Sequence, residues 1–500
     1  MKRYYALISV MILLPQLILA QTFADAFRMS YNQIQGTARS AGMGNAFGAL
    51  GGDFTSLSIN PAGSALYQTG EFVVTPSYYI NKSTRTAGNT SYSDNDQGIR
   101  LNNIGAVGVF KTNRSEAGII SINYGVGYNR MANYNGAGFA NFDQSNVSWL
   151  RDIESYANSE MLSNAYLSNQ QFGNVEYRDW PTKLAWDTYL INPAQDDQGN
   201  DIDGSYWNVL YPDELVDQRK TFSQSGHVDE YLFNIGLNFN HKFYLGTTIG
   251  IHDLVYNKNT SYEELLPENS SFQYYDDYHM EGNGFNIKIG AIYKPVQTVR
   301  LGLAFHSPTF YDIDEESSLT MRSDLSWESQ PYSDYGVNRY SYDFNTPMKI
   351  VASGAFIFGK RGLVSADVEY IDYGSMRYRR GGNGSDNFND LNSVMGDVFK
   401  AVVNVRAGVE YKLTNQFTIR GGFENYGNPF KSTLDQQATL RDNVSVVSAG
   451  FGYSINSFSL NAAYTNTMAK YSEGNEQPNY YQLHRKDNNH NILVTFGFRF

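Results

Sequence analysis

The last ten residues, Asn491-Ile492-Leu493-Val494-Thr495-Phe496-Gly497-Phe498-Arg499-Phe500, carry the pattern on which the fold prediction rests. Every second residue from Ile492 onward is apolar, and the residues between them are mostly small or polar. Because successive side chains of a β-strand point to opposite faces, such a segment has one apolar face and one polar face. The stretch predicts a strand with an apolar environment on one side only.

The same alternation recurs upstream, around residues 285–293, 403–411 and 417–424. A half-buried soluble sheet would also alternate. Two details favour a membrane barrel instead: the polar faces carry many Arg, Lys and Glu, and the segments reach about ten residues, the length of a tilted transmembrane strand.

Applied to the whole chain, this pattern predicts an all-β protein, a transmembrane antiparallel β-barrel of about fourteen strands. The expected strands are 71–81, 99–112, 116–130, 229–241, 244–262, 281–294, 298–307, 339–358, 362–374, 400–413, 416–427, 443–455, 457–470 and 489–500. Short connections alternate with long ones, as expected for periplasmic turns opposite extracellular loops. The long loops are 82–98, 131–228, 263–280, 308–338, 375–399, 428–442 and 471–488.

The segments outside the strands predict the domain organisation. Residues 1–20 have a basic start, an uncharged apolar stretch and a small residue at Ala20, which predicts a signal peptide cleaved after Ala20. Residues 21–70 are rich in Gly and Ala without a strand pattern, and we expect them to form a hatch that plugs the lumen. Residues 71–500 then form the barrel, with a long extracellular insertion at about 131–228 that has helical spacing between 147 and 167.

Composition excludes several functions. The chain has no Cys, which rules out disulfides and thiolate chemistry, and its net charge of −12 comes with no basic patch for nucleic acid. No metal site or cofactor is expected, because the seven His are scattered. The acidic run 196–204 resembles a calcium loop without the correctly spaced Glu, so a solvated loop is expected. No nucleophile motif is present, so the chain is not expected to be an enzyme.

Two N-terminal motifs carry a family resemblance. The segments Ser40-Ala41-Gly42-Met43-Gly44-Asn45-Ala46-Phe47 and Ser58-Ile59-Asn60-Pro61-Ala62-Gly63 resemble the hatch and the Asn-Pro-Ala motif of FadL/TodX-type outer-membrane transporters, in the variety common in Bacteroidetes. The resemblance implies a fourteen-stranded plugged barrel that carries long-chain fatty acids and other hydrophobic compounds. Its plug and turn motif would be Gly42, Gly44, Asn60, Pro61 and Ala62. Since Pro fixes φ and Asn bonds backbone groups of its own turn, this turn could lock the plug against the wall.

Five charged residues of the polar strand faces are candidates for a lumen network: Arg300, Arg406, Glu410, Arg420 and Glu424. We expect them to be ion pairs that tie wall to plug, and the alternative is that one of them holds a substrate carboxylate. The resemblance also implies a lateral gap at a kink in the third strand. Gly125 and Gly127 are the candidates for that gap, because glycines weaken a strand; alternatively, they make room for the plug.

These observations predict an outer-membrane uptake channel for hydrophobic small molecules. Molecules would be captured at the extracellular loops, pass the plug and leave sideways through the wall. The insertion contains aromatic residues that either capture the ligand or pack the insertion's own small core: Trp149, Trp180, Trp186, Tyr189, Trp207 and Tyr211. Alternatives are a porin for polar solutes and a surface barrel for adhesion or partner docking. The expected partners are the hydrophobic ligand, outer-membrane lipid and the barrel assembly machinery, which would recognise the strand ending in Phe500, and a monomer is expected.

Overall fold

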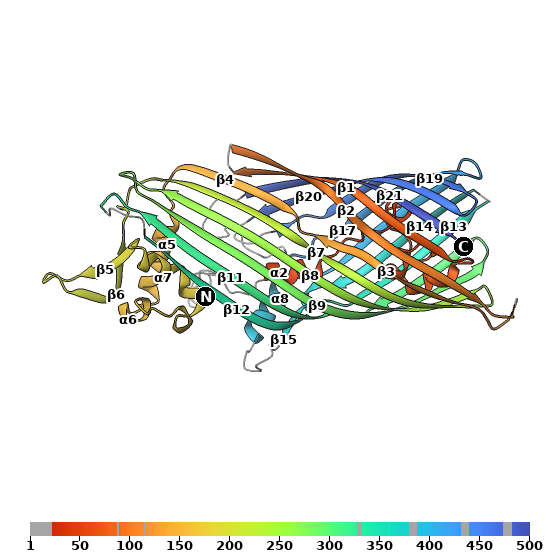
Figure 1. Cartoon of the computed structure of the whole chain (residues 1–500), viewed down its shortest axis with the longest axis horizontal. Coiled ribbons are helices and arrows are strands. Elements are labelled where there is room, and N and C mark those ends of the chain that lie inside the picture. The colour runs from red at the N-terminus through yellow and green to blue at the C-terminus, as the bar shows by residue number, and fades with distance from the viewer. Residues whose placement is uncertain are drawn as a thin grey trace, which may run out of the picture.

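The protein is a long β-barrel with a plug inside it and a mixed cap at one end (Figure 1). The computed structural model describes residues 23–87, 90–114, 117–327, 332–359, 361–379, 388–431, 440–473 and 483–500. The proposed signal peptide therefore lies outside the described residues. None of the helices in these ranges is long and apolar enough to cross a membrane.

Fourteen antiparallel strands close the barrel. They are β1 (Glu71–Ala87), β2 (Thr90–Lys111), β3 (Ile119–Asn133), β7 (Val216–Phe239), β8 (Phe243–Leu265), β9 (Ser271–Val296), β10 (Val299–His306), β13 (Lys349–Phe358), β14 (Gly362–Asp372), β16 (Ala401–Lys412), β17 (Phe417–Tyr426), β19 (Val444–Ile455), β20 (Phe458–Glu473) and β21 (Leu483–Arg499). The first and last strands pair from Glu71↔Arg499 upward, so the sheet closes without a free edge there. The predicted fold class and strand number are confirmed.

The outer surface explains the alternation in the sequence. On β9, Phe285, Ile287 and Ile289 are exposed on the outside, whereas Asn286 and Lys288 between them are buried against the lumen. Equivalent outward apolar residues occur on β16 and on β21. A continuous exposed apolar band of this kind is rare in soluble proteins and matches the lipid-facing band of outer-membrane barrels.

The two ends of the barrel differ. At one end, here called the turn end, adjacent strands join through tight turns such as 240–242 and 456–457, and both Glu71 and Arg499 lie there. At the other, the loop end, the strands continue well beyond the apolar band. The predicted long loops 82–98 and 263–280 are mostly continuous hairpins, because β1 pairs with β2 up to Ala87↔Thr90 and β8 with β9 up to Leu265↔Ser271.

Two predicted boundaries are wrong for a shared reason. The expected strand 339–358 is divided into β12 (Tyr332–Asn345) and β13, and the expected loop 308–338 is largely a hairpin of β11 (Phe310–Asp324) with β12. The interruptions contain Pro308 and Pro347, which lack a backbone N–H for the ladder. Thr309 and Thr346 join the two breaks, because the backbone N–H of each bonds the other residue.

The insertion forms a compact cap at the loop end. It begins with β4 (Gly136–Ser145), which pairs with β7, and continues with α5 (Trp149–Ser159), α6 (Asn164–Leu167), η2 (Phe172–Asn174), η3 (Tyr177–Asp179), α7 (Trp180–Asp187) and the hairpin of β5 (Ile191–Gln195) and β6 (Asp201–Asn208). Ser148 caps α5 through the Leu150 N–H. The apolar faces of α5 and α7 pack on residues of β8, β9 and β11, so the cap shares a core with the hairpins.

The hatch lies inside the barrel. It comprises α2 (Phe23–Ser30), α3 (Ala38–Ala41), α4 (Ser56–Ile59) and η1 (Pro61–Leu66). Short elements complete the loop end: β15 (Arg377–Arg379), β18 (Leu440–Arg441), η4 (Tyr373–Ser375) and α8 (Asn389–Val398). Met43, Phe47 and Leu50 of the hatch are buried against wall residues such as Val351.

Candidate functional site

Side chains of the wall hold the backbone of the hatch. The Gly48 N–H donates to Asp367 on β14 at 3.0 Å, and the Ala38 N–H donates to Thr495 on β21 at 2.7 Å. In the other direction, wall side chains donate to hatch carbonyls. These bonds are Thr248 to Leu57 (2.9 Å), Asn234 to Pro61 (3.1 Å), Asn123 to Ser64 (2.6 Å) and His306 to Ile59 (2.9 Å). Since an irregular segment cannot satisfy its own backbone groups, these polar wall residues substitute for secondary structure.

The Asn-Pro-Ala turn lies at one such contact. The side-chain oxygen of Asn60 accepts from the Ala62 N–H at 3.2 Å, and its amide group donates to the carbonyls of Gly48 (2.7 Å) and Ala291 on β9 (3.2 Å). Pro61 begins η1, where its missing N–H is not needed. Asn60 thus joins its own turn, a distant part of the hatch and the wall.

The hatch glycines lie where backbones approach closely. Gly44 has φ +58°, and a Cβ there would lie 2.7 Å from the Phe423 backbone N and 2.9 Å from the Ala407 carbonyl oxygen. A Cβ on Gly42 would lie 3.1 Å from the Cα of Gly450. Gly44 therefore requires glycine for both conformation and space, and Gly42 for space alone.

The predicted charged residues all face the lumen. Arg406 lies between Asp367 (3.8 Å) and Glu369 (3.6 Å), and Glu410 pairs with Arg420 at 2.6 Å. Glu410 also pairs with Arg39 of the hatch at 3.0 Å. Glu424 accepts from Asn45 of the hatch (3.1 Å), and Arg300 donates to the Leu50 carbonyl. The contacts with Arg39, Asn45 and Leu50 tie the wall to the hatch, whereas the other pairs join neighbouring wall strands. Sequence patterns did not predict Arg39, because α3 shows no strand alternation.

Gly125 and Gly127 lie in a paired part of β3. Gly125 pairs with Val107 and Asn234, and Gly127 pairs with Gly105 and Leu232, so the ladder is continuous on both sides. A Cβ on Gly125 would lie 2.4 Å from Leu57 of the hatch, and one on Gly127 would lie 2.5 Å from Phe54. The expected gap is not located at these glycines, which instead make room for the hatch.

The ladder between β2 and β3 ends further along the strands. Its last pair is Asn103↔Asn129, and beyond it the described part of β2 pairs with β1 alone. The pairing of β3 with β7 has a bulge at Met131, and β4 continues along β7. We call this unpaired boundary between β2 and β3–β4 the seam. The apolar residues Ile99 and Leu101 lie on β2 close to the start of the seam, and their side chains are exposed on the outside of the barrel.

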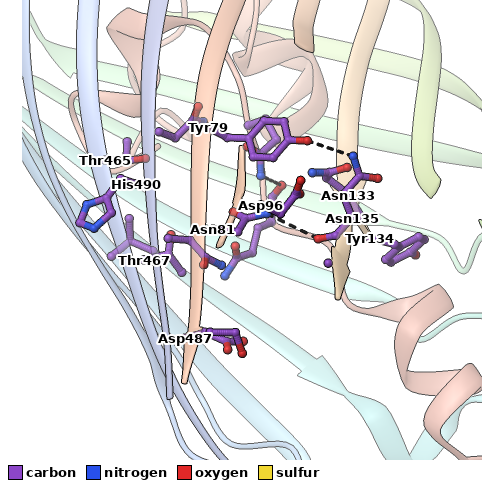
Figure 2. A pocket seen from close by; sticks show the side chains of 18 of the residues that line it. Tyr79, Asn81, Asp96, Asn133, Tyr134, Asn135, Thr465, Thr467, Asp487 and His490 are labelled. Atoms are coloured by element: carbon purple, nitrogen blue, oxygen red, sulfur yellow. Dashed lines mark hydrogen bonds between the residues drawn. The ribbon is translucent and has the colours of Figure 1, made fainter. Parts of the chain in front are cut away.

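Side chains close the seam on the lumen side. Arg85 on β1 donates to the Ala137 carbonyl on β4 at 3.2 Å, and the Asn135 amide donates to the Tyr79 hydroxyl at 3.0 Å (Figure 2). The hydroxyl of Tyr92 reaches the Asn141 carbonyl at 3.4 Å, and the Tyr92 and Phe139 rings are 5.1 Å apart. A few side-chain bonds thus replace a backbone ladder.

A polar cavity of about 310 Å³ lies behind the seam (Figure 2). It is bounded by β1, β2, β3–β4, β20, β21 and the hatch segment between α2 and α3. Its lining includes Asn81, Asp96, Asn135, Thr465 and Asn491. These residues escaped sequence reasoning because most of them belong to segments with polar residues on both faces.

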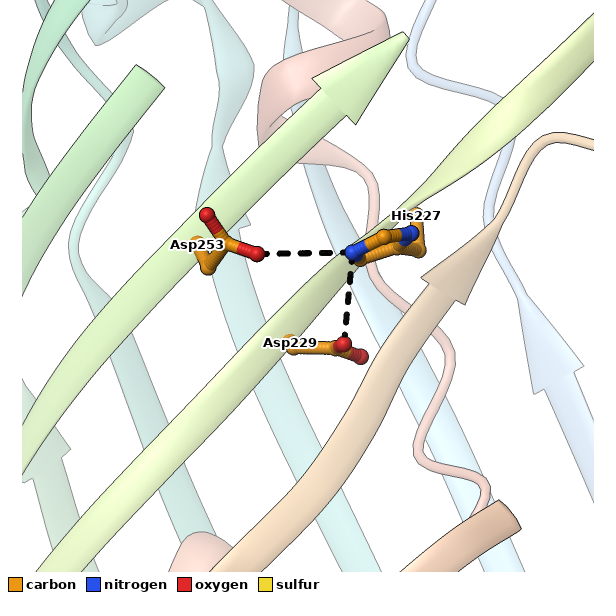
Figure 3. A group of neighbouring side chains, drawn as sticks. All are labelled: His227, Asp229 and Asp253. Carbon is orange, nitrogen blue, oxygen red and sulfur yellow. Dashed lines mark hydrogen bonds and ion pairs between the residues drawn. The ribbon is translucent and has the colours of Figure 1, made fainter. Parts of the chain in front are cut away.

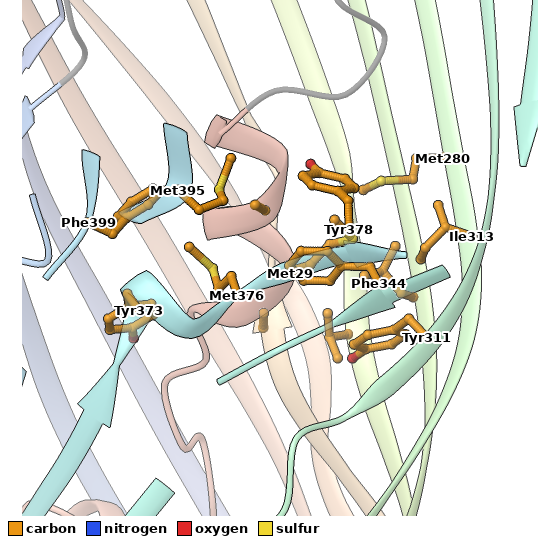
Figure 4. Close-up of a cluster of buried hydrophobic side chains, with 14 of the residues drawn as sticks. Met29, Met280, Tyr311, Ile313, Phe344, Tyr373, Met376, Tyr378, Met395 and Phe399 are labelled. Carbon is orange, nitrogen blue, oxygen red and sulfur yellow. The ribbon is translucent and has the colours of Figure 1, made fainter. Parts of the chain in front are cut away.

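An apolar cluster surrounds α2 on the loop side of the hatch (Figure 4). Met29 and Ala26 of α2 are fully buried, and Phe27 stacks on Phe399 with ring centroids 5.9 Å apart. The remaining partners are mostly Met and aromatic side chains: Met131, Tyr256, Met280, Tyr311, Tyr342, Phe344, Tyr373, Met376, Tyr378, Met395 and Phe430. Met and aromatic surfaces adapt to apolar groups of varied shape.

A third group of side chains lies on the outer face. The Nε2 atom of His227 is 3.4 Å from carboxylate oxygens of both Asp229 and Asp253, on neighbouring strands (Figure 3). Asp229 is already paired with Arg130 at 2.5 Å and with the Tyr128 hydroxyl at 2.9 Å. The group is a polar cluster in which Asp229 already has two other partners.

The acidic loop between β5 and β6 is organised by its own hydrogen bonds. Asp196 accepts from the backbone N–H groups of Gln198 and Asn200, both at 2.8 Å. Those bonds lower the pKa of Asp196, which is fully exposed, below its usual value. The geometry is that of a solvated turn.

Together, the closed barrel, the lipid-facing band and the bonded hatch define a class of protein, an outer-membrane transport barrel plugged by its own N-terminal segment. The family model described as outer membrane protein transport protein (OMPP1/FadL/TodX) matches residues 230–500. The chain belongs to this family. Family members are channels and transporters, not enzymes.

Solved structures show the same fold at low identity. A Pseudomonas aeruginosa FadL homologue has 12% identity and a TM-score of 0.55, with 94% of this chain and 99% of that chain covered. The Ralstonia pickettii toluene transporter TbuX has 14% identity and a TM-score of 0.50, with the same coverage. No curated protein sequence matches the chain.

Proposed function

We propose that the protein takes up hydrophobic small molecules, long-chain fatty acids among them, from the cell surface. The observation that carries the proposal is the apolar cluster of Met and aromatic side chains inside a barrel whose lumen is occupied by the hatch. Transfer of a hydrophobic molecule from water to such a surface is favourable. A porin for polar solutes needs an open, water-filled lumen instead. The turn end would face the periplasm and the cap would face outward.

As part of the same proposal, the ligand leaves sideways through the seam into outer-membrane lipid. Release into periplasmic water would cost about 0.8 kcal/mol for each CH₂ group hydrated. The seam is the supporting feature, because side chains rather than a ladder close it. The protein would act as a monomer, and the barrel assembly machinery would insert it.

Uptake by cells tests the proposal. Cells that lack their own carrier and express the protein should accumulate labelled fatty acid but not a labelled sugar. Reconstituted wild type should show little ion current, and a variant without residues 23–66 should insert and conduct. Steady wild-type current without fatty-acid uptake would support the porin instead.

A reversible bridge tests the exit. Tyr92→Cys and Phe139→Cys, in a chain with no other Cys, should be linked across the seam by a bis-methanethiosulfonate reagent. Uptake should fall after bridging, ligand binding should persist, and reduction should restore uptake. Unchanged uptake in the bridged protein would rule out exit through the seam.

Partner docking is a second candidate, favoured by exposed aromatic residues on the cap. Trp207 and Tyr211 are 48% and 72% exposed. Because Ser145 pairs with Val216, residues 146–215 can be replaced by a short turn without breaking the wall. If uptake survives this excision, the cap serves another role such as docking; if uptake is lost, the cap captures the ligand.

A further inference from the structure

We propose that the polar cavity behind the seam binds the uncharged, hydroxyl-rich head of an amphiphilic molecule. The inference rests on the proposed uptake function and narrows its substrate class. A bare hydrocarbon or a simple fatty acid would leave this cavity unused.

The lining has the chemistry of a neutral polar site. Amide and hydroxyl side chains predominate, and they can both donate and accept hydrogen bonds. They are Gln33, Gln35, Tyr79, Asn81, Ser83, Asn133, Tyr134, Asn135, Gln224, Thr465, Thr467, Asn489 and Asn491. A volume of about 310 Å³ is at the lower end for small-molecule sites and suits a single sugar-sized or glycerol-sized group.

The cavity holds charges of both signs, and most of the charged groups already contact protein groups. Its cations, Arg85, Arg100 and Arg485, face three carboxylates, Asp94, Asp96 and Asp487. The Arg485–Asp487 pair is 3.3 Å apart, and Arg485 also lies over the Tyr471 ring. Arg100 donates to Gln35 (3.1 Å) and lies over the Tyr79 ring. A fourth acid, Glu424, is occupied by Asn45 and Tyr426. With three cations against four carboxylates, this arrangement does not select an anionic head.

Several buried acceptors and donors point to a polar ligand. Among the described residues, no protein group bonds Ser83 Oγ, Asp96 Oδ2, Asp487 Oδ1 or Asn491 Oδ1. Asn491 is only 9% exposed. Buried polar atoms are normally satisfied, and hydroxyl groups of a ligand head would satisfy them, whereas an alkyl group would not.

The cavity also borders an apolar surface. Tyr31, Ala132 and Tyr134 line the cavity and belong to the apolar cluster or pack against it. A molecule with its head in the cavity can therefore place its hydrocarbon part on these residues. The two surfaces together match an amphiphile.

Three ligands with the same twelve-carbon chain separate the possibilities: 1-monolauroylglycerol, methyl laurate and laurate. Binding to the whole protein in lipid nanodiscs should be at least about tenfold tighter for monolauroylglycerol than for the other two, since a site built for hydroxyls rejects ligands lacking them. Equal binding of monolauroylglycerol and methyl laurate, or tightest binding of laurate, would overturn the proposal but leave hydrophobic uptake intact. Binding of none would overturn both.

Substitutions in the cavity test whether the preference for monolauroylglycerol arises there. Asn81→Leu and Asn491→Leu should each reduce monolauroylglycerol binding about tenfold and leave methyl laurate binding unchanged. Asn95→Leu is the matched control, because Asn95 lies on β2 between Asp94 and Asp96 but is exposed on the opposite face. Equal losses in Asn95→Leu, or no loss in the cavity variants, would contradict the assignment. The comparison of ligands on wild type needs no variant and stands even if one misfolds.

Discussion

At the scale of single residues, the hatch depends on a few side chains that each make several bonds. Asn60 is the clearest case, because it is 1% exposed and bonds its own turn, Gly48 and Ala291. Asn60→Ala would leave two buried carbonyls without that donor, at about 1–3 kcal/mol each. We expect a loosened hatch, seen as frequent brief current openings in planar bilayers and a lower thermal midpoint. Asn60→Asp keeps the acceptor for Ala62 but loses the donors, so a silent Asp variant would contradict the role given to the amide group.

Gly125 makes a second residue-scale prediction. Gly125→Val would push Leu57 out of its place, and overpacking of this kind costs about 1–3 kcal/mol. We expect ion leakage in bilayer recordings, and we expect Leu57→Ala in the same chain to reduce the leakage by vacating the space. If Gly125 instead shaped a gap in the wall, adding Leu57→Ala to Gly125→Val would leave the ion leakage unchanged.

At the scale of elements, the cap should be sensitive to alkali. Asp179 accepts from the hydroxyls of Tyr156 (2.6 Å) and Tyr166 (2.7 Å). Burial, with a further effect from Asp179, raises the pKa of Tyr166 to about 12 and raises that of Tyr156 as well. A tyrosine with a raised folded-state pKa stabilises the fold fully below its unfolded value near 10 and loses that contribution as the pH rises through 12. Tryptophan fluorescence should therefore report loss of the cap between pH 10 and 12, because four of the five Trp lie in it, while the β-sheet signal in circular dichroism persists. Simultaneous loss of both signals would contradict an independent cap transition.

The sequence predicts the membrane-crossing elements well and the others poorly, for one physical reason. A strand such as β16 has lipid on one face and a packed lumen on the other, so Val403 and Val405 alternate with Asn404 and Arg406. The extensions of β1 and β2 beyond the apolar band are polar on both faces, and the period disappears although the pairing continues. Those extensions line one side of the polar cavity. The hatch motif and inward charges were predictable, whereas Arg39 and the seam depend on contacts between distant segments.

At the scale of the whole molecule, assembly can be separated from stability at Phe500. Its N–H donates to the Gly70 carbonyl at 3.0 Å, but its side chain is 68% exposed, so the assembled barrel gains little from it. We expect Phe500→Asp to lower surface levels several-fold while the inserted fraction keeps nearly the wild-type melting point. Leu413→Asp, an exposed apolar residue at the same end, is the control. Equal surface levels in Phe500→Asp and wild type would contradict the proposal that the barrel assembly machinery recognises the strand ending in Phe500.

The seam also gives the wall an uneven stiffness. A tube slit part-way from one end resists twisting far less at the slit end than at the intact end. Here the turn end is an uninterrupted ring of paired strands, and the slit begins at Asn103 and Asn129. Thermal motion should therefore deform the loop end more than the turn end. In hydrogen exchange, the β2 amides between Thr90 and Asn102 that face the slit should exchange far sooner than those between Asn103 and Lys111. The barrel should therefore combine a fluctuating loop end with a rigid turn end.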